Sequence, residues 1–244
     1  MLLMMAAVVF AQGDASFAKE NMELLEQWAS YLLRYGLDPE NQLCTDDFAG
    51  HLAHNCNLSL KAIMALAAYS ELCAKLGEKD KASEYRSAAE NMAKSWLEMA
   101  ANGDGSYRLT FDKPDTFSLK YNMVWDKVMG LGLFSESTIN SEVESYFRHM
   151  RPYGIPLDCR ADYTKSDWQI WTATLAKSKA LFEKMIAPLW TAYHFSPSRV
   201  PMTDWYSAVT SLQCGGFRHR TVQGGLFMKL LDERGIVKAG KTGC

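Results

Sequence analysis

Residues 58–72, LSLKAIMALAAYSEL, decide the fold of this chain, because they predict a helix that is apolar on almost every side. Such a helix is enclosed by other elements, whereas a helix with one apolar stripe lies at the surface. The following segment, 79–101, has such a stripe among Lys, Glu and Arg residues. The stripe consists of Ala82, Tyr85, Ala89, Met92 and Trp96. The two segments predict a helical hairpin with an inner helix at 55–77 and an outer helix at 79–101.

The same alternation returns along the rest of the chain. Enclosed helices are expected at 2–12, 123–134, 167–177 and 219–232, and surface helices at 15–35, 137–151 and 178–194. Strand signals are confined to 105–121, where short alternating runs flank Lys113-Pro114 and predict a small β-hairpin excursion. Hairpins that each hide one helix form a ring, so the sequence predicts an all-α fold, an α/α toroid whose ring is not closed here.

The composition of the chain bears on its domain number, its partners and its apolar start. The chain has 244 residues, 48% of them apolar, and no Gly/Ser-rich or Pro-rich linker, so residues 1–244 are expected to form one domain. Lys plus Arg total 26 and Asp plus Glu total 28, which argues against a nucleic-acid partner. The apolar start, MLLMMAAVVFA, is too short to span a bilayer and lacks a basic leader, so we expect a buried helix rather than a signal peptide.

Acidic and aromatic residues recur just before or at the start of the predicted inner helices. They are Asp46-Asp47, Trp125-Asp126, Asp167-Trp168 and Asp204-Trp205. In a ring of hairpins these loops and helix N-termini converge on one mouth, where positive helix ends favour carboxylates and anions. Simple N-capping is the competing explanation for Asp167 and Asp204, because each follows a Ser or Thr in a capping pattern. An unpaired Asp126 in its apolar run would be costly to bury, so either a basic residue such as Lys127 pairs with it or it lines a cavity.

Histidines and one arginine complete the set of candidates. His51, His54 and Asn55 lie in the polar stretch DDFAGHLAHNCN, and Arg220 precedes the last predicted inner helix. The two histidines are three residues apart, but the pattern lacks the HExxH spacing of zinc enzymes, and the six cysteines show no zinc spacing. We therefore expect no metal and no cofactor.

Four separated motifs occur in the order found in one known family. They are residues 45–59, TDDFAGHLAHNCNLS, 121–127, YNMVWDK, 166–172, SDWQIWT, and 224–231, GGLFMKLL. With them the chain resembles the six-hairpin domain of the glutaminase A family from residue 1 to about residue 231. The resemblance implies an incomplete (α/α)6 toroid of the six-hairpin glycosidase type. It also implies a secreted or cell-envelope enzyme of fungi or bacteria in which this domain follows a β-rich domain. Residues 1–244 would then be an N-terminally truncated fragment, and the missing N-terminal domains would be its partners.

The resemblance implies hydrolysis of glutamine to glutamate and ammonia, without supplying a mechanism. Amide hydrolysis needs an activated water or nucleophile and donors for the developing oxyanion. The candidate catalytic residues are Asp46, Asp47 and Asp126. The candidate substrate-binding residues are His51, His54, Asn55, Trp125, Asp167, Trp168, Asp204, Trp205 and Arg220. Two alternatives stay open, namely a glycoside hydrolase with paired carboxylates and stacking tryptophans, and a ligand-binding toroid without catalysis.

Overall fold

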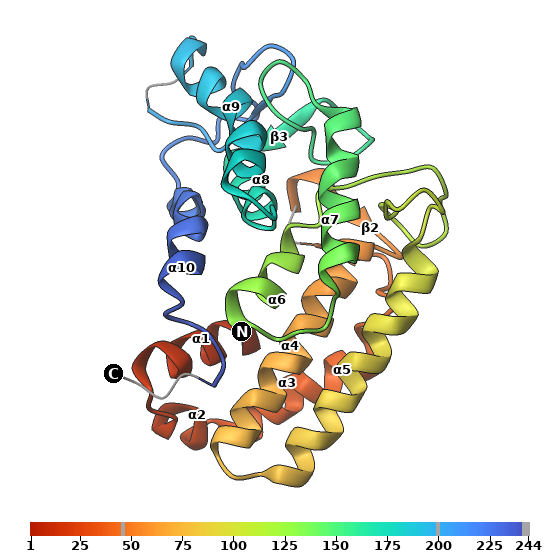
Figure 1. The fold of residues 1–244 in the computed structure, drawn as a ribbon, viewed down its shortest axis with the longest axis vertical. Helices are drawn as coiled ribbons and strands as arrows, with labels where there is room; N and C mark the ends of the chain where they lie inside the picture. The colour runs from red at the N-terminus through yellow and green to blue at the C-terminus, as the bar shows by residue number, and fades with distance from the viewer. Residues whose placement is uncertain (45–46, 199–200, 241–244) are drawn as a thin grey trace.

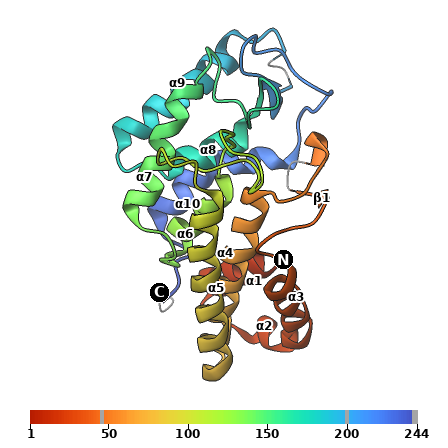
Figure 2. The ribbon, with the colours of Figure 1, turned by 90° about the vertical axis from the view of Figure 1, so that its right-hand side faces the viewer.

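The computed structural model describes residues 1–44, 47–198 and 201–240. Its centre is the antiparallel hairpin of α4 (Cys56–Lys75) and α5 (Lys79–Ala100), which run side by side in Figures 1 and 2. In α4, 15 of 20 residues are buried, against 6 of 22 in α5. The inner and outer helices predicted from the sequence are thus confirmed, as is the all-α class.

The turn and the packing of this hairpin follow from a few residues. Asn55 caps α4, since its side-chain oxygen accepts the N–H groups of Asn57 and Leu58 at 3.0 Å. Gly77, with φ of 81°, turns the chain between the helices. Trp96 of α5 is fully buried and donates its indole N–H to the carbonyl of Cys56 at 2.8 Å, which fixes the two helices against each other.

The first three helices, α1 (Leu2–Gln12), α2 (Ser16–Glu20) and α3 (Met22–Tyr35), pack beside α4. The prediction that α1 is enclosed holds for one face only, because Met4 is 57% exposed. The exposed large apolar residues of this region are Met1, Met4, Val8, Phe17, Leu24, Tyr31, Leu33 and Tyr35. A groove of about 370 Å³ lies among them, lined by Leu3, Trp28 and Tyr31. A contact of this face with another domain stays a prediction.

The middle of the chain forms shorter helices than the sequence predicts. It contains η2 (Tyr121–Met123), α6 (Val124–Met129), α7 (Glu136–Ser145) and η3 (Tyr146–His149). The helix predicted at 123–134 ends early because Gly130 adopts φ of 70° and Gly132 φ of 67°.

A second helical hairpin, α8 (Ser166–Thr174) with α9 (Lys179–Phe195), lies at the opposite end of the molecule from the α4–α5 turn (Figure 1). Eight of the nine residues of α8 are buried, as predicted for an inner helix. Two short antiparallel strand pairs accompany the helices. They are β1 (Gln42–Leu43) with β2 (His51–Leu52) and β3 (Tyr163–Lys165) with β4 (Trp205–Ser207).

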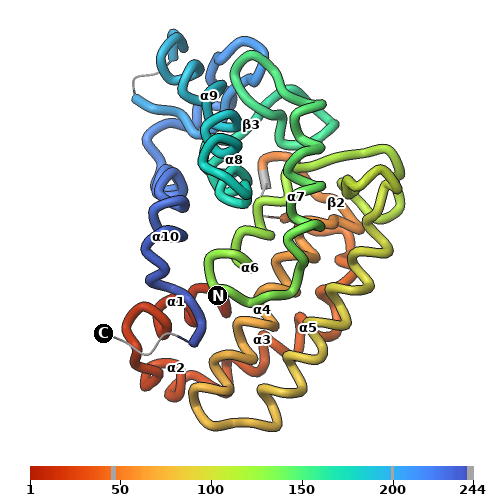
Figure 3. Tube along the Cα trace, viewed as in Figure 1, coloured from red at the N-terminus to blue at the C-terminus, as the bar shows by residue number. Residues whose placement is uncertain are grey.

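The prediction of an enclosed helix at 219–232 is wrong. The chain forms a 3-10 helix, η4 (Thr221–Phe227), without a buried residue, and then α10 (Met228–Arg234), in which only Met228 is buried. The pair Gly224-Gly225 falls in η4, and glycine disfavours a regular α-helix. Figure 3 traces this last part of the chain, in blue, past α8 and α6.

The β-hairpin expected within 105–121 is also corrected. The excursion exists, but its residues bridge to other segments instead of pairing with one another. Tyr107 pairs with Ala101, Thr110 with Asn55, and Ser118 with Asp158. Pro114 lacks a backbone N–H and the following Asp115 adopts φ of 59°, so this turn does not continue into a strand ladder.

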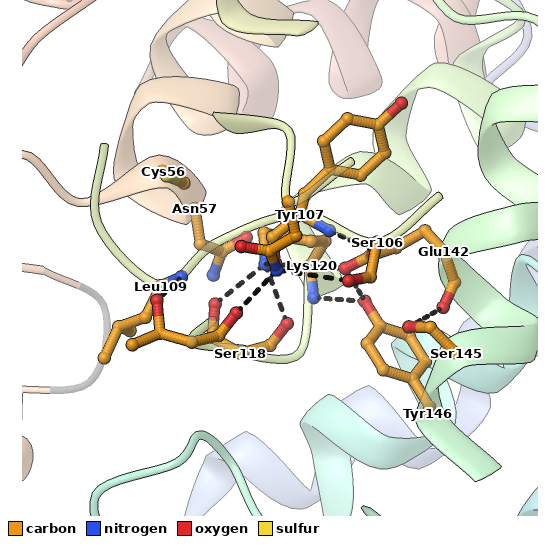
Figure 4. A network of polar contacts seen from close by, with 12 residues as sticks. Cys56, Asn57, Ser106, Tyr107, Leu109, Ser118, Lys120, Glu142, Ser145 and Tyr146 are labelled. Carbon is orange, nitrogen blue, oxygen red and sulfur yellow. Dashed lines mark hydrogen bonds and ion pairs between the residues drawn. The ribbon is translucent and has the colours of Figure 1, made fainter. Parts of the chain in front are cut away.

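A buried polar network ties this excursion to α7 (Figure 4). The Lys120 ammonium donates to the carbonyls of Tyr107 and Ser118 and to the Ser118 hydroxyl, at 2.9 to 3.0 Å, and lies 3.4 Å from Glu142. The Glu142 carboxylate also accepts the Tyr146 hydroxyl and the Tyr107 N–H, each at 2.9 Å. All the charged atoms of this pair therefore have partners within the protein.

Among the described residues, no helix combines the length and the apolar character needed to cross a membrane.

Candidate functional site

The register of β3 against β4 brings together two of the acidic and aromatic motifs. Lys165 pairs with Trp205, so the residue before β4, Asp204, lies beside the residues that begin α8. The N–H of Ser166 donates to the carbonyl of Asp204 at 3.0 Å and fixes this junction. The candidates Asp167 and Asp204 thus meet, although they are far apart in the sequence.

The two carboxylates share one ammonium group. Lys165 Nζ lies 3.2 Å from Asp167 Oδ2 and 3.2 Å from Asp204 Oδ2. Asp167, Asp204 and Lys165 are 1%, 0% and 3% exposed. Burial raises the pKa of Asp167 from its ordinary 3.8 to about 6, while the charge and hydrogen bond of Lys165 act in the opposite direction. Asp167 can therefore take up and release a proton near neutral pH.

Arg220 adds a second cation at the edge of this group. Its guanidinium lies 3.8 Å from Asp204 Oδ2 and 4.2 Å from the centre of the Phe217 ring. Arg220 is only partly buried, so it connects the group with the surface.

Several buried polar atoms around the group have no hydrogen-bond partner within the described part of the chain. They are Oδ1 of Asp167, both carboxylate oxygens of Asp204, the indole nitrogens of Trp168 and Trp171, and Nε2 of Gln223. Asp204 Oδ2 still makes the ion pairs with Lys165 and Arg220 given above. Unpaired buried polar groups are few in native proteins because each costs free energy. Their accumulation here marks a place where a ligand with both donors and acceptors could bind.

An aromatic wall borders the acidic group. Trp168 stacks on Tyr121, with ring centres 4.1 Å apart, and Lys165 Nζ lies 5.0 Å from the Trp168 ring centre. Trp171 packs edge-on against Trp168 at 4.9 Å and against Trp125 at 5.0 Å. Trp125 of α6, a candidate from the sequence, thus belongs to the aromatic wall. Its ring packs on Trp171, which in turn packs on Trp168.

The acidic pair before α4 lies at the border of the described structure. Asp46 is outside the described residues, and Asp47 begins the short 3-10 helix η1 (Asp47–Ala49). The next residue, Phe48, packs 4.6 Å from the ring of Trp205 and 5.6 Å from that of Tyr163. The backbone of η1 therefore adjoins β3 and β4, and the assignment of Asp46 and Asp47 as catalytic stays a prediction.

The structure gives Asp126 a different surrounding from that of Asp167. Its Oδ1 accepts the N–H of Leu133 at 2.9 Å and its Oδ2 the N–H of Phe134 at 3.1 Å. Lys127, considered above as its partner, donates instead to the carbonyls of Thr174 and Ala176. Burial raises the pKa of Asp126, and these backbone N–H groups counteract the rise. Asp126 holds the turn after α6.

The remaining candidates lie around the start of α4. The Asn55 side chain is used to cap α4. His54 lies 2.7 Å from Asp38, whose hydrogen bond raises the pKa of the imidazole. His51 is exposed in β2. None of the three contacts Lys165, Asp167 or Asp204 in the interactions described.

Sequence reasoning missed Lys165 and Gln223, and it placed Trp171 beside the acidic motifs without naming it as a site residue. Lys165 lies one residue before a Ser-Asp capping pattern and reads as an ordinary surface lysine. Its position at the end of a short strand, in YTK before SDW, is the one signal that places it beside Asp167. Trp171 lies on α8, the same helix as Asp167 and Trp168. Gln223 lies in η4, within the segment that the sequence wrongly predicts as an enclosed helix.

A comparison with known proteins identifies the family. The profile described as "Glutaminase A six helical-hairpin domain" matches residues 1–230. The chain belongs to this family. It is 31% identical over 236 residues to glutaminase A of Aspergillus oryzae, covering 95% of the chain and 34% of the relative. It is 27% identical to a protein of Arthroderma benhamiae named as a probable glutaminase, covering 89% of the chain and 29% of the relative. The chain spans about a third of the length of these relatives.

Among the residues described, no cluster of three or more His, Cys, Asp or Glu side chains is arranged to hold a metal ion.

Proposed function

We propose that this chain carries the reaction centre of a hydrolase that converts glutamine to glutamate and ammonia, and that Asp167, Lys165 and Asp204 form this centre. The relatives named as glutaminases support the reaction. The observation that supports the position is the buried pair of carboxylates on one ammonium group, with unpaired oxygens on both. Perturbed, buried acidic groups of this kind are typical of functional sites.

Each carboxylate has a distinct role in this proposal. Asp204, which contacts two cations, takes a proton from a water molecule as that water attacks the amide carbon and a C–O bond forms. Asp167 gives its proton to the leaving nitrogen as the C–N bond breaks, and ammonia departs. A pKa of about 6 suits this second step, because a proton donor works best when its pKa lies near the working pH.

The indole N–H groups have a role in the same reaction. The tetrahedral intermediate carries negative charge on the former carbonyl oxygen, and donors that lack other partners can stabilise this charge. Trp168 and Trp171 offer such donors beside Asp167. Lys165 acts by holding both carboxylates in place.

Glycoside hydrolysis is the second candidate, because it also needs two carboxylates on one site. The tryptophans weigh against it. Sugar rings stack on free tryptophan faces, but Trp168 already stacks on Tyr121, and Trp205 packs against both Phe48 and Phe217. A binding function without catalysis is the third possibility, and the same assay addresses all three.

The test measures ammonia release from glutamine and cleavage of an aryl glycoside by the full-length protein. We expect glutamine to react and the glycoside to be inert. We expect Asp204→Asn to lower the rate with glutamine by at least about 100-fold, the lower end of what a positioned acid or base contributes. The matched control is Asp162→Asn, which alters an exposed aspartate paired with Arg151. Glycoside cleavage without ammonia release, or full glutaminase activity in Asp204→Asn, would contradict the proposal.

A further inference from the structure

The 3-10 helix η4, residues Thr221–Phe227, lies directly on α8 over the carboxylate group, and we call it the strap. At Gly225, a β-carbon would come 2.7 Å from Asp167 Cβ and 2.9 Å from Trp171 Nε1. At the neighbouring Gly224, nothing lies within 4 Å of such a carbon. The strap backbone at Gly225 therefore fills the space in front of Asp167 and Trp171.

The polar side-chain contacts that hold the strap are long, and its Leu226 packs against the core while only partly buried. None of its residues is buried. Gln223 Oε1 accepts from the hydroxyls of Ser166 and Tyr193, both at 3.5 Å, which is the outer limit of a hydrogen bond. Arg220, at its N-terminal end, reaches Asp204 at 3.8 Å. A segment with few buried apolar side chains and long polar contacts opens at a low free-energy cost.

The polar atoms beneath the strap do not pair with it. Asp167 Oδ1 and Trp171 Nε1 are buried and have no hydrogen-bond partner in the described ranges, although the strap backbone touches both residues. Leaving a buried donor and a buried acceptor unpaired costs free energy, which a ligand in the place of the strap would recover. With the strap in place, these two polar atoms of Asp167 and Trp171 beneath it therefore lack hydrogen bonds within the described residues.

We propose that the strap is a movable cover over the position of the reacting amide. When the strap lifts, Trp171 Nε1 donates to the carbonyl oxygen of a primary carboxamide, and Asp167 Oδ1 faces the amide nitrogen. A primary carboxamide fits this pair because it offers an acceptor and a nitrogen on the same carbon. This inference rests on the proposed glutamine hydrolysis and adds a movable segment that covers the place of the substrate amide.

Gly225→Ala and Gly224→Ala, made in the full-length protein, test the cover directly. The added β-carbon collides with Asp167 and Trp171 in the first variant only, so we expect faster hydrogen exchange of the backbone across 219–230 in Gly225→Ala alone. Water then reaches Asp167, and because burial is the main cause of its raised pKa, we expect the pKa to fall from about 6 toward its ordinary value. Carboxyl NMR titration measures this fall.

The role of Trp171 is tested by Trp171→Phe, which keeps the ring and removes the N–H. We expect kcat with glutamine to fall by about 100-fold, as for the loss of one oxyanion donor, while the melting temperature does not fall, because the N–H that is removed has no hydrogen-bond partner in the described ranges. Unchanged kcat in this variant would remove Trp171 from the substrate site.

The outcomes separate this inference from the proposed function. If Gly225→Ala behaves like Gly224→Ala in exchange and in the titration of Asp167, the cover is overturned. If the strap behaves as expected but the wild-type protein releases no ammonia from glutamine, the proposed function fails and the cover stands. Should Gly225→Ala not fold, Gln223→Ala loosens the strap without a collision and is expected to raise exchange in the same segment; unchanged exchange there would also overturn the cover.

Discussion

Two buried lysines of this molecule have opposite surroundings. Lys120 donates to three protein oxygens, and its partner Glu142 has both carboxylate oxygens occupied. Lys165 is nearly as deeply buried, but it lies between Asp167 and Asp204, and oxygens of both carboxylates lack hydrogen bonds within the described residues. The hydrogen bonds of the Lys120 group are complete within the described part of the protein, whereas those of the Lys165 group are not.

The difference separates structural polar networks from functional ones. A fully bonded network holds its segments in one arrangement, which at Lys120 means the attachment of the excursion at 105–121 to α7. A network with unpaired atoms destabilises the protein and persists where a ligand or a reaction uses those atoms. Buried charge alone therefore does not indicate a site, whereas buried charge with free hydrogen-bonding capacity does.

The largest stability effect is expected at the complete network. Lys120→Met leaves the buried Glu142 without its cation, and breaking such a pair typically costs about 3–5 kcal/mol of unfolding free energy. Urea denaturation measures the loss. Lys177→Met is the control, because its ion pair with Glu144 is more than half exposed and should matter little. Equal stability of the two variants would contradict a structural role for Lys120.

The incomplete network should appear in the pH dependence of stability. Because the folded pKa of Asp167 is raised from 3.8 to about 6, the native state binds a proton that the unfolded state has lost. Wild-type stability should thus fall as pH rises from about 4 to about 6, by up to roughly 3 kcal/mol from this residue. Asp167→Asn removes this contribution. We expect the difference between the two urea-unfolding curves to change across that window, and a constant difference would show an ordinary pKa.

A smaller loss is expected at Asp126, the aspartate whose oxygens both accept backbone N–H groups. Asp126→Asn replaces one acceptor by a donor that faces another donor, so unfolding free energy should fall by about 1–3 kcal/mol. Thermal melting compares this variant with Asp115→Asn, at an exposed turn residue. A melting temperature equal to that of the control would show that the turn after α6 does not depend on Asp126.

The sequence predicts the helices well where a long apolar pattern is uninterrupted. Residues 56–75 and 79–100 follow their predicted burial closely, because burial alone sets the pattern of a long hairpin. The segment 219–232 is also predicted to be an enclosed helix, but with Gly224-Gly225 in it and with its packing on α8 it contains the partly exposed strap instead. Short glycine-containing segments take their conformation from tertiary contacts, which the sequence pattern does not contain.

The candidate site was predictable only in part. The motifs Asp167-Trp168 and Asp204-Trp205 were found because acidic and aromatic residues recur together near inner helices. Lys165 was not found, since only the pairing of β3 with β4 places it between the two carboxylates. Asp126 belongs to a motif of the same two residue types in the reverse order, Trp125-Asp126, yet the turn after α6 uses its oxygens, which the sequence does not predict.

The same substitution at these two buried aspartates tests the central claim most directly. Ammonia release from glutamine is measured near pH 6 for Asp167→Asn and Asp126→Asn in the full-length protein, with rates normalised to the folded fraction. We predict a loss of at least about 100-fold for Asp167→Asn, because a proton donor is removed, and near wild-type turnover for Asp126→Asn despite its lower melting temperature. Full activity in Asp167→Asn together with an inactive, folded Asp126→Asn would contradict the account.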